Sequence, residues 1–594
     1  MSTSVTADTV HWRLSDLLDG GGPEEVGALL DEAIARAEAF AKRYRGALAE
    51  IDAGGLREAM EELAQIHDLA GRAGSYAGLD FSTDTADPKR GALLQLVQER
   101  GTTLETLLLF FDLEWAALED ARADELLAGE GLDFARHHLR TARRYRPHLL
   151  SEPEELILTE KALSARSAWT RLFEEQTASI EVELEQTVTL DVALSRLAVP
   201  SREVRAETAA AVTRALEPGL RTRAFVFNSL LVDKMVDDRL RSYDNWLADR
   251  NLANEASDES VAALIAAVKG RYELPRRWYR LKAKLLGIDR LADYDRMAPL
   301  APDEVEVAWP DAQATVLEGY HAFSPVLGDL AQRFFDESWI DAPPGPGKRG
   351  GAFCAYTVPS VHPYVLLNYT SRRRDVLTLA HELGHGLHSA LAAKQGIFHQ
   401  GTPLTLAETA SVFGESLIFA SLLEASPTPA ARLALLAENI EDAIATVFRQ
   451  VAMNQFEDRV HTERRETGEL SVERFGELWV ASQEELLGDA VEVTDGYRSW
   501  WSYIPHFIGS PGYVYAYAYG QLLALSVYER YLEEGAGFEQ QYVELLASGG
   551  SRSPEELGEI VGIDLSDPGF WERGLDLVER RLEEAEAAAA ASGQ

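Results

Sequence analysis

The chain has 594 residues, of which 46% are hydrophobic, so it can form one large or several smaller domains and is not a mainly disordered protein. Its 57 basic and 97 acidic residues give a formal charge of −40, which argues against nucleic acid or an anionic membrane as a partner, because phosphate binding requires clustered Lys and Arg. Cys354 is the only cysteine, which excludes an intrachain disulfide and a cysteine-based zinc site.

The first residues, 1–20, have neither the basic stretch nor the apolar core of a signal peptide. No apolar run reaches the roughly 18 residues of a membrane span. We therefore expect a cytoplasmic protein that binds neither membrane nor nucleic acid. The composition predicts no particular oligomeric state.

Most of the chain shows the three- and four-residue spacing of apolar side chains that is typical of amphipathic helices. In chain order, such helices are predicted over residues 24–44, 88–121, 152–174, 202–216, 257–285, 303–335, 430–467 and 513–534. Between the third and fourth of them, residues 178–197 alternate apolar and polar side chains and predict a short β-structure. The predicted fold class is therefore mainly α with a small β element.

A loop rich in Pro and Gly is predicted over residues 342–351, and two short strands, within AFCAYTVPS and YVLLNYT, are predicted after it. We place a domain boundary near residue 200. The predicted domains are an N-terminal helical domain, 1–200, and a catalytic domain, 201–586. The alanine-rich end of the chain, 587–594, is predicted to be a flexible tail.

The sequence HELGH begins at His381, inside a predicted helix that starts after Asp375 and ends near Gly396. Positions i and i+4 of a helix share one face, so the imidazoles of His381 and His385 can reach one metal ion together. Glu382 projects beside them and can act as a general base on a metal-bound water without being a ligand. This spacing predicts a hydrolase with one Zn²⁺ per chain.

A catalytic zinc takes three protein ligands and keeps one position open. The third histidine of the metzincin pattern would fall at Leu391, which excludes that subclass. We interpret His388 as a packing or outer residue, because three ligands from two consecutive turns would crowd one side of the ion. A further helix is predicted over LTLAETASVFGESL, in which Glu408 and Glu415 are two turns apart on one face. Glu408 is the predicted third ligand, and Glu415 is the predicted acceptor that orients one histidine.

A second candidate element precedes the zinc helix. Gly350 and Gly351 lack side chains and let a substrate backbone approach closely, and the strand that starts at Ala352 can pair with an extended peptide. Such pairing recognises the main chain and tolerates many side chains. We therefore predict that these three residues bind substrate, and we interpret Cys354 within the strand as a small packed residue.

These motifs together resemble the thimet oligopeptidase family, and within it the oligoendopeptidase F branch. The likeness is carried by GKRGGAFCAY, HELGHGLH, LAETASVFGE and the late segment IPHFIGSPGYVYAYAYG. It implies a two-lobed helical shell with a gluzincin-type catalytic core and zinc deep in a channel that admits only flexible oligopeptides. The sequence departs from that branch at Gly512, where relatives often carry an aromatic residue.

The resemblance also implies that His506 and Tyr513 donate hydrogen bonds to the reaction's oxyanion, with Tyr517 as a lesser candidate that binds substrate. Alternate tyrosines of a helix cannot all face one cleft. We therefore expect at least two of the tyrosines in this segment to be core residues. These are Tyr513, Tyr515, Tyr517 and Tyr519.

The predicted function is zinc-dependent hydrolysis of internal bonds in short, unstructured oligopeptides. One alternative is a helical zinc carboxypeptidase or dipeptidyl carboxypeptidase, for which Arg372, Arg373 and Arg374 are candidates to bind the substrate's terminal carboxylate. Another alternative is a non-catalytic helical protein that binds metal or peptide. Such a protein would have no use for Glu382.

Overall fold

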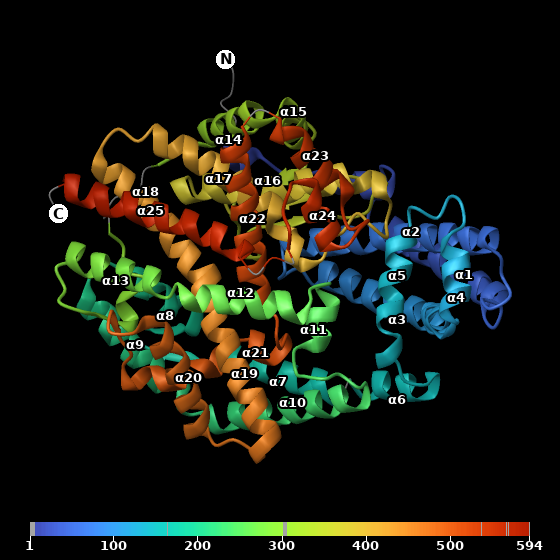
Figure 1. Ribbon diagram of the computed structural model, residues 1–594, viewed down its shortest axis with the longest axis horizontal. Coiled ribbons are helices and arrows are strands. Elements are labelled where there is room, and N and C mark those ends of the chain that lie inside the picture. The colour runs from blue at the N-terminus through green and yellow to red at the C-terminus, as the bar shows by residue number, and fades with distance from the viewer. Residues whose placement is uncertain are drawn as a thin grey trace. The chain divides into compact units, whose positions relative to one another are not determined.

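The computed structural model describes residues 6–162, 164–300, 306–535, 537–565, 567 and 569–592, and Figure 1 shows that they form mainly helices. Contacts within the chain define two compact units. Unit 1 comprises Met1–Leu149, Glu304–Leu422 and Val527–Leu565, and unit 2 comprises Leu150–Asp303, Leu423–Ser526 and Ser566–Gln594. Each unit is thus assembled from three segments. None of these segments begins or ends near residue 200, where the sequence analysis places a domain boundary.

The helices that lie in unit 1 are α1 (Glu25–Tyr44), α2 (Ala53–Thr83), α3 (Pro88–Ala117), α4 (Asp120–Leu127), α5 (Arg136–Arg144), α14 (Trp309–Phe323), α15 (Pro325–Asp336), α16 (Arg373–Ala392), α23 (Phe538–Ser548) and α24 (Pro554–Ile560). The helices of unit 2 are α6 (Glu152–Ala162), α7 (Arg166–Ala178), α8 (Leu190–Ser195), α9 (Arg202–Leu216), α10 (Leu220–Leu240), α11 (Ala248–Ala253), α12 (Asp258–Gly270), α13 (Glu273–Leu285), α18 (Pro429–Ala443), α19 (Arg449–Thr467), α20 (Val472–Leu487), α21 (His506–Gly509) and α25 (Phe570–Ser592). The division between the units falls within α17 (Leu404–Glu424) and α22 (Tyr515–Glu534).

The strands are short. Unit 1 has one sheet in the order β4-β6-β5, made of β4 (Ile340–Asp341), β5 (Phe353–Ala355) and β6 (Tyr364–Leu366). β6 runs parallel to β4 and antiparallel to β5, with Cys354 opposite Val365. β5 is therefore an edge strand. Unit 2 has the hairpin β1 (Glu181–Glu183) and β2 (Thr187–Thr189), where the sequence predicts β-structure, and the parallel pair β3 (Leu291–Ala292) and β7 (Val491–Glu492).

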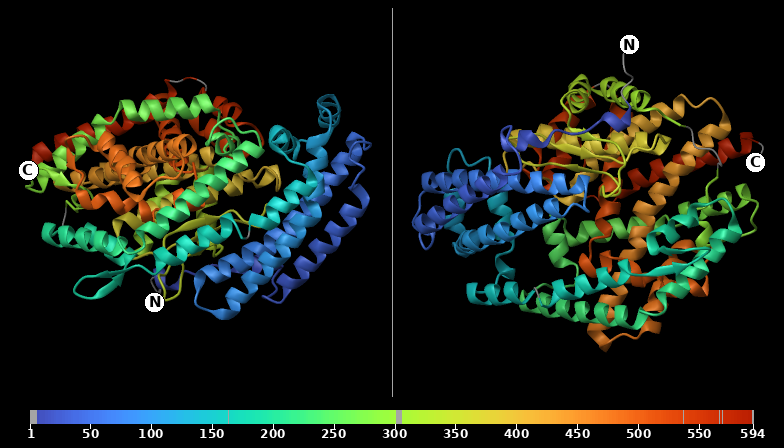
Figure 2. Two further views of the ribbon diagram at one scale, coloured as in Figure 1. Left: turned by 90° about the horizontal axis from the view of Figure 1, so that it is seen from below. Right: turned by 180° about the vertical axis from the view of Figure 1, so that it is seen from behind.

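A bundle of three long helices, α1, α2 and α3, forms the first part of unit 1 and appears in blue in Figures 1 and 2. Its core buries apolar side chains from all three helices, among them Phe40, Leu63 and Phe110. Asp52 caps the start of α2 by accepting the N–H of Gly55 at 2.8 Å. Phe398, from the segment between α16 and α17, packs against this core and so joins the bundle to the part of unit 1 described below.

The core of unit 2 is rich in aromatic side chains. Phe227 of α10, Phe456 of α19, Trp479 of α20 and Phe507 of α21 are all buried in one cluster. Rings of this size bury large apolar areas and dominate the packing of a helical core. Phe507 anchors the short helix α21, whose first residue is His506.

The predicted helical segments are helical in the structure, but three of them each divide into two helices: 152–174 into α6 and α7, 257–285 into α12 and α13, and 303–335 into α14 and α15. Residues 303–305 of the last segment lie outside the described residues. The helix predicted over 88–121 breaks after Ala117, and a new helix begins at Asp120. The flexible tail predicted from residue 587 is wrong over 587–592, because α25 continues to Ser592 with Ala588 and Ala589 buried. Alanine is the strongest helix former, and here it also fills a packed face. Residues 593–594 lie outside the described residues.

By length and composition, α17 is apolar enough to cross a membrane, with a mean hydropathy of 1.4 over its most apolar window. However, 56% of that window is buried inside the structure, and the helix carries Glu408 and Glu415. Burial of this kind is typical of a core helix.

Candidate metal centre

A glycine in α16 and a glycine in α17 each make room for a close contact beside the site. A Cβ on Gly384 would overlap the carbonyl oxygen of Ala410 and lie 2.6 Å from the Cα of Ser411. A Cβ on Gly414 of α17 would overlap the ring of Tyr320, whose hydroxyl donates to the carbonyl of Ala380 at 2.8 Å. Gly384 therefore lets the backbones of α16 and α17 approach closely, and Gly414 makes room for Tyr320 of α14, which bonds to α16.

The helix α16 begins at Arg373, two residues before Asp375 and so earlier than predicted, and it ends near Gly396 as predicted. Asp375 accepts the backbone N–H groups of Thr370 at 2.7 Å and Arg372 at 3.1 Å, which satisfies donors at the helix start. The helix ends at Ala392, and a short 3-10 turn leads to Gly396, whose φ of +79° favours glycine.

The structure brings together His381, His385 and Glu408. The Nε2 atoms of the two histidines lie 3.4 and 3.6 Å from the same carboxylate oxygen, Oε2 of Glu408. One ligand atom from each of the three residues lies within 4.8 Å of the others. A tetrahedral zinc with bonds of about 2.0 Å separates its ligand atoms by roughly 3.3 Å. The separations between nitrogen and oxygen therefore fit a zinc ion, and the donor set of two imidazoles and one carboxylate does too.

Outer partners orient the two imidazoles. The Nδ1 atom of His381 lies 3.3 Å from Oε2 of Glu415, the residue predicted for this task. The Nδ1 atom of His385 lies 3.4 Å from the hydroxyl of Tyr356, which the sequence analysis did not identify. Both contacts occupy Nδ1 and leave Nε2 of each ring available to the metal.

Ser411 is a further partner that the sequence analysis missed. Its hydroxyl donates to Oε2 of Glu408 at 2.7 Å. The spacing of three residues on one helix was the available signal for this contact. His388, in contrast, is buried at 3% exposure, and burial lowers its pKa to about 3, so it is a packed neutral residue.

The charges of the site influence one another. Burial acts to lower the pKa of His381, but the hydrogen bond to Glu415 and the charge of Glu408 together raise it to about 9. Burial lowers the pKa of His385. Burial opposes ionisation of Glu408, yet the two histidines and Ser411 hold its pKa below the usual value, so it is a carboxylate. A metal ion must therefore displace a proton from this cluster when it binds.

Glu382 lies in the same helix and is 7% exposed. Burial raises the pKa of its carboxyl to about 7, with a further contribution from the charge of Glu408. The nearby His381 and a hydrogen bond from the backbone N–H of Cys354 oppose the shift. A carboxyl with a pKa near neutrality is suited to take up and release a proton.

The hydrogen bond from Cys354 to Glu382 links the zinc helix to β5. On the other side of the sheet, the N–H of Val365 donates to the carbonyl of Trp339, so this residue of β6 faces β4. Cys354 lies opposite Val365, and its backbone groups therefore point to the free edge of β5. A peptide strand that paired with this edge would lie beside the carboxyl of Glu382.

The loop before β5 is open. Gly350 and Gly351 are exposed, and a Cβ added to either would meet no atom within 4 Å. Gly351 has a φ of +79°, a conformation that favours glycine. Asn368 holds the loop by donating to the carbonyl oxygens of Arg349 at 2.9 Å and Gly351 at 2.8 Å. Ala352 connects this loop to the edge strand.

His506, Tyr513 and Tyr517 form a cluster in unit 2. Nε2 of His506 lies 3.2 Å from the hydroxyl of Tyr517, and the ring centroids of Tyr513 and Tyr517 are 5.1 Å apart. All three side chains are half-buried. Burial, with a contribution from the charge of Arg449, lowers the pKa of His506. That these residues act on a substrate at the metal stays a prediction.

The other two tyrosines of this segment are core residues. Tyr515 is fully buried and donates to Oδ1 of Asn251 at 2.7 Å, and Tyr519 is buried with its hydroxyl 3.3 Å from that of Ser260. The expectation that at least two of the four tyrosines are structural is therefore confirmed.

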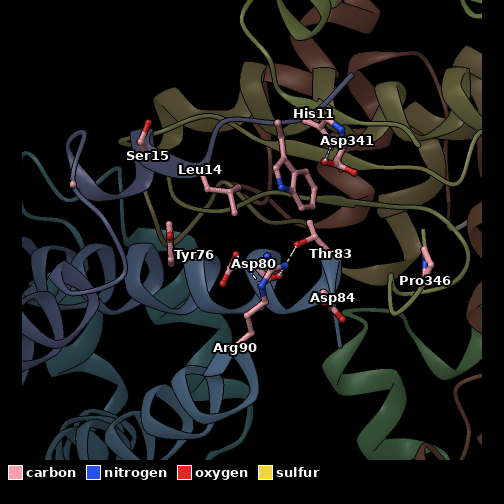
Figure 3. A pocket seen from close by; sticks show the side chains of 12 residues that line it. His11, Leu14, Ser15, Tyr76, Asp80, Thr83, Asp84, Arg90, Asp341 and Pro346 are labelled. Atoms are coloured by element: carbon pink, nitrogen blue, oxygen red, sulfur yellow. Dashed lines mark hydrogen bonds and ion pairs between the residues drawn. The ribbon is translucent and has the colours of Figure 1, made fainter. Parts of the chain in front are cut away.

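A cavity of about 560 Å³ lies elsewhere in unit 1 (Figure 3) and contains none of the predicted site residues. Two of the three carboxylates that line it, Asp341 and Asp80, form ion pairs. Asp341 lies 3.0 Å from Nδ1 of His11 and 2.6 Å from Nζ of Lys348, and Asp80 lies 3.7 Å from Nε of Arg90. The figure shows His11 and Asp341 facing one another at one side of the cavity.

A mainly helical fold in which an HExxH helix meets a glutamate of the next helix defines a metallopeptidase of the gluzincin type. Comparison with protein families agrees with this class. The sequence profile described as Peptidase family M3 matches residues 196–577, and that described as Oligopeptidase F matches residues 114–181. The chain belongs to Peptidase family M3, and it is a metalloendopeptidase.

Individual relatives confirm the resemblance to the oligoendopeptidase F branch. Oligopeptidase PepF of Bacillus subtilis (strain 168) is 26% identical over 585 residues, which cover 97% of this chain and 86% of the relative. An oligoendopeptidase F homolog of Lactococcus lactis subsp. lactis (strain IL1403) is 30% identical over 351 residues, or 59% of this chain and 58% of the relative.

Solved structures show the same fold. The oligoendopeptidase-F of Enterococcus faecium has a TM-score of 0.72 and 21% identity, and the match covers 94% of this chain and 97% of that one. A protein from Chlamydophila abortus has a TM-score of 0.84 and 22% identity, with 99% of both chains covered.

Proposed function

We propose that this metalloendopeptidase hydrolyses internal bonds of short, unstructured oligopeptides with one Zn²⁺ per chain, held by His381, His385 and Glu408. The observation that carries the proposal is the approach of two Nε2 atoms to Oε2 of Glu408, beside the buried Glu382. The relatives named oligopeptidase and oligoendopeptidase support oligopeptides as the substrate class.

The chemistry is divided between the metal and Glu382. A zinc ion held by His381, His385 and Glu408 would lower the pKa of a coordinated water to around 7 and would polarise the scissile carbonyl. Glu382 takes a proton from the attacking water and returns it to the leaving amine. Burial, which raises the pKa of this carboxyl in the metal-free site, favours its protonated form and so suits it to both transfers.

His506 and Tyr513 donate hydrogen bonds to the oxyanion that develops on the scissile carbonyl. Their partial exposure within one cluster supports this role, as does the resemblance of the late tyrosine-rich segment to oligoendopeptidase F. Each such donor typically contributes about 100- to 1000-fold in rate. Tyr517 contacts His506 at 3.2 Å and binds substrate beside it.

The substrate binds through its main chain. Gly350, Gly351 and Ala352 leave room for a peptide, and the free edge of β5 supplies backbone hydrogen-bonding groups. Because main-chain pairing is largely independent of side chains, this mode supports broad sequence tolerance. An extended strand is required, so segments inside folded proteins are poor substrates.

The protein acts in the cytoplasm, without nucleic-acid or membrane partners. A single cysteine suits a reducing compartment, and the net charge of −40 disfavours association with phosphate-rich surfaces.

Mass spectrometry of peptide digests tests the proposal. A decapeptide that is acetylated at its N-terminus and amidated at its C-terminus should be cut internally. Chelation with o-phenanthroline should stop the cleavage, and one equivalent of Zn²⁺ should restore it. Cleavage confined to peptides with a free C-terminal carboxylate would support the carboxypeptidase alternative instead. Turnover that persists in metal-free protein would contradict the metal assignment.

A further inference from the structure

A buried glutamate of α19 holds the turn that precedes Tyr513. The side chain of Glu457 is fully buried, and its Oε1 accepts the backbone N–H of Gly512 at 2.9 Å. Gly512 lies between α21 and α22, directly before Tyr513. Nothing in the chemistry proposed above uses this carboxyl, although it accepts a hydrogen bond from the residue directly before Tyr513, a predicted catalytic residue.

One backbone N–H group of the turn, that of Gly512, has Glu457 as its acceptor. Within the turn, the N–H of Ser510 bonds to the carbonyl of His506 at 3.0 Å, and that of Tyr513 bonds to the carbonyl of Ser510 at 3.1 Å. The N–H of Gly512 points instead to Glu457. Gly512 is itself buried, so an N–H without this acceptor would be cut off from water, which would destabilise the turn.

Side chains also pack against the other side of Gly512. Its φ is +74°, and an added Cβ would lie 2.6 Å from Cδ1 of Leu247 and 3.4 Å from the ring of Trp246. The guanidinium of Arg250 lies 5.9 Å from the centroid of the Tyr513 ring. The glycine is therefore fixed between Glu457 and the segment before α11, and its conformation sets the direction in which the next side chain leaves the backbone.

The carboxyl of Glu457 behaves as an uncharged acceptor. Burial raises its pKa to about 8, while the bond from Gly512 and the charge of Arg250 oppose the shift. Its Oε2 is buried and has no hydrogen-bond partner among the described residues. The turn thus requires an acceptor oxygen of this reach and shape, and an amide oxygen meets the same requirement.

We propose that Glu457 is a positioning residue for the hydrolytic reaction, because its hydrogen bond to Gly512 fixes the turn that presents Tyr513. Glu457 acts through the backbone and does not contact substrate. The inference rests on the proposed function of Tyr513 as a donor to the oxyanion. Loss of the bond leaves substrate binding largely intact but lowers the rate of the chemical step.

A double-mutant cycle tests this inference, with kcat and KM measured on an internally quenched peptide. Tyr513→Phe should lower kcat about 100- to 1000-fold. Glu457→Leu should lower kcat at least about 10-fold with KM changed by less than about 3-fold, and the double variant should be no slower than Tyr513→Phe. Glu457→Gln should stay within about 3-fold of the parent protein, because its amide oxygen still accepts the N–H of Gly512.

Two controls separate positioning from general damage. Tyr519→Phe removes another buried hydroxyl of the same segment and should leave kcat unchanged. Gly512→Ala disturbs the turn without altering Glu457, so it should reproduce the loss of kcat and the lack of additivity with Tyr513→Phe. If Glu457→Leu does not fold, Gly512→Ala still tests the inference.

The outcomes distinguish the two claims. If Tyr513→Phe is as fast as the parent protein, the proposed role of Tyr513 fails, and the positioning role fails with it. If Tyr513→Phe is slow but the losses from Glu457→Leu or Gly512→Ala multiply with it, only the inference about Glu457 is overturned. A Glu457→Leu protein with unchanged kcat also overturns that inference.

Discussion

Gly384 of α16 lies against the carbonyl oxygen of Ala410 in α17, and no side chain larger than hydrogen fits between the two backbones. The contact falls between the two histidines of HELGH that are the predicted metal ligands, one residue before His385. It therefore sets the distance at which Glu408 meets the two imidazoles.

Substitution of this glycine should weaken the metal centre. Gly384→Ala forces α17 away from α16, so the zinc dissociation constant should rise at least about 10-fold and the free energy of unfolding should fall by about 1–3 kcal/mol. Gly78→Ala in α2 is the matched control, because a Cβ there meets no atom within 4 Å. The control should retain zinc and gain up to about 1 kcal/mol of stability from its higher helix propensity. Competition with a chromophoric chelator measures the zinc affinity, and equal values for Gly384→Ala and the parent protein would refute the role of this contact.

Glu415 should raise the zinc affinity of the site through its negative charge and through its contact with Nδ1 of His381, which orients that ring. Glu415→Gln keeps an oxygen that can accept from Nδ1 but removes the charge, and Glu415→Leu removes both. Outer partners of this kind typically contribute about 10- to 100-fold in metal affinity, so zinc affinity should fall in the order parent, Gln variant, Leu variant. The same chelator competition measures it. Undiminished affinity in the Leu variant would show that the 3.3 Å contact has no function in metal binding.

His399 should make the stability of unit 1 sensitive to acid. Its Nε2 accepts the backbone N–H of His138, in the first turn of α5, at 3.1 Å. Burial, with the nearby His137 and His138, lowers the pKa of His399 to about 4. The unfolded chain, with a pKa near about 6.5, binds the proton first as pH falls, so stability is complete above about pH 6.5 and is lost toward pH 4, by up to about 3 kcal/mol.

Urea unfolding at pH 7 and pH 5 checks this expectation. His399→Gln keeps an acceptor for the N–H of His138 but cannot be protonated, so its stability should change less between the two pH values than that of the parent protein. Equal changes in the two proteins would exclude His399 as a source of the acid sensitivity.

The central residues of the site follow from local sequence. Spacing of four residues on one helix is enough to place His381 beside His385, and the two-turn spacing from Glu408 to Glu415 is enough to place both carboxylates on one face. The structure brings these side chains together as the spacing predicts.

The supporting contacts could not be predicted in this way. Tyr356 meets His385, and the N–H of Cys354 meets Glu382, only because the edge strand β5 lies against α16. The bond from Gly512 to Glu457 joins residues 55 positions apart. Such contacts are fixed by the packing of distant elements, which leaves no local periodic signal.

The packing of distant elements also explains why the sequence did not predict how the chain divides into its two units. Helix periodicity predicts most of the helices, but each compact unit is assembled from three separate segments, and no composition change marks their ends. The alanine-rich end has the composition of a tail, yet the burial of Ala588 and Ala589 keeps it helical. Here tertiary packing decided between two states that composition alone allows.

Zinc content and peptide hydrolysis, measured side by side for Glu382→Gln and Glu408→Gln, separate the proposed general base from the proposed third metal ligand. The proposed mechanism predicts that Glu382→Gln keeps one zinc per chain and loses hydrolysis by several orders of magnitude, whereas Glu408→Gln loses zinc as well as activity. A Glu408→Gln protein that binds zinc as tightly as the parent protein, or a Glu382→Gln protein that hydrolyses peptides at the parent rate, would contradict it.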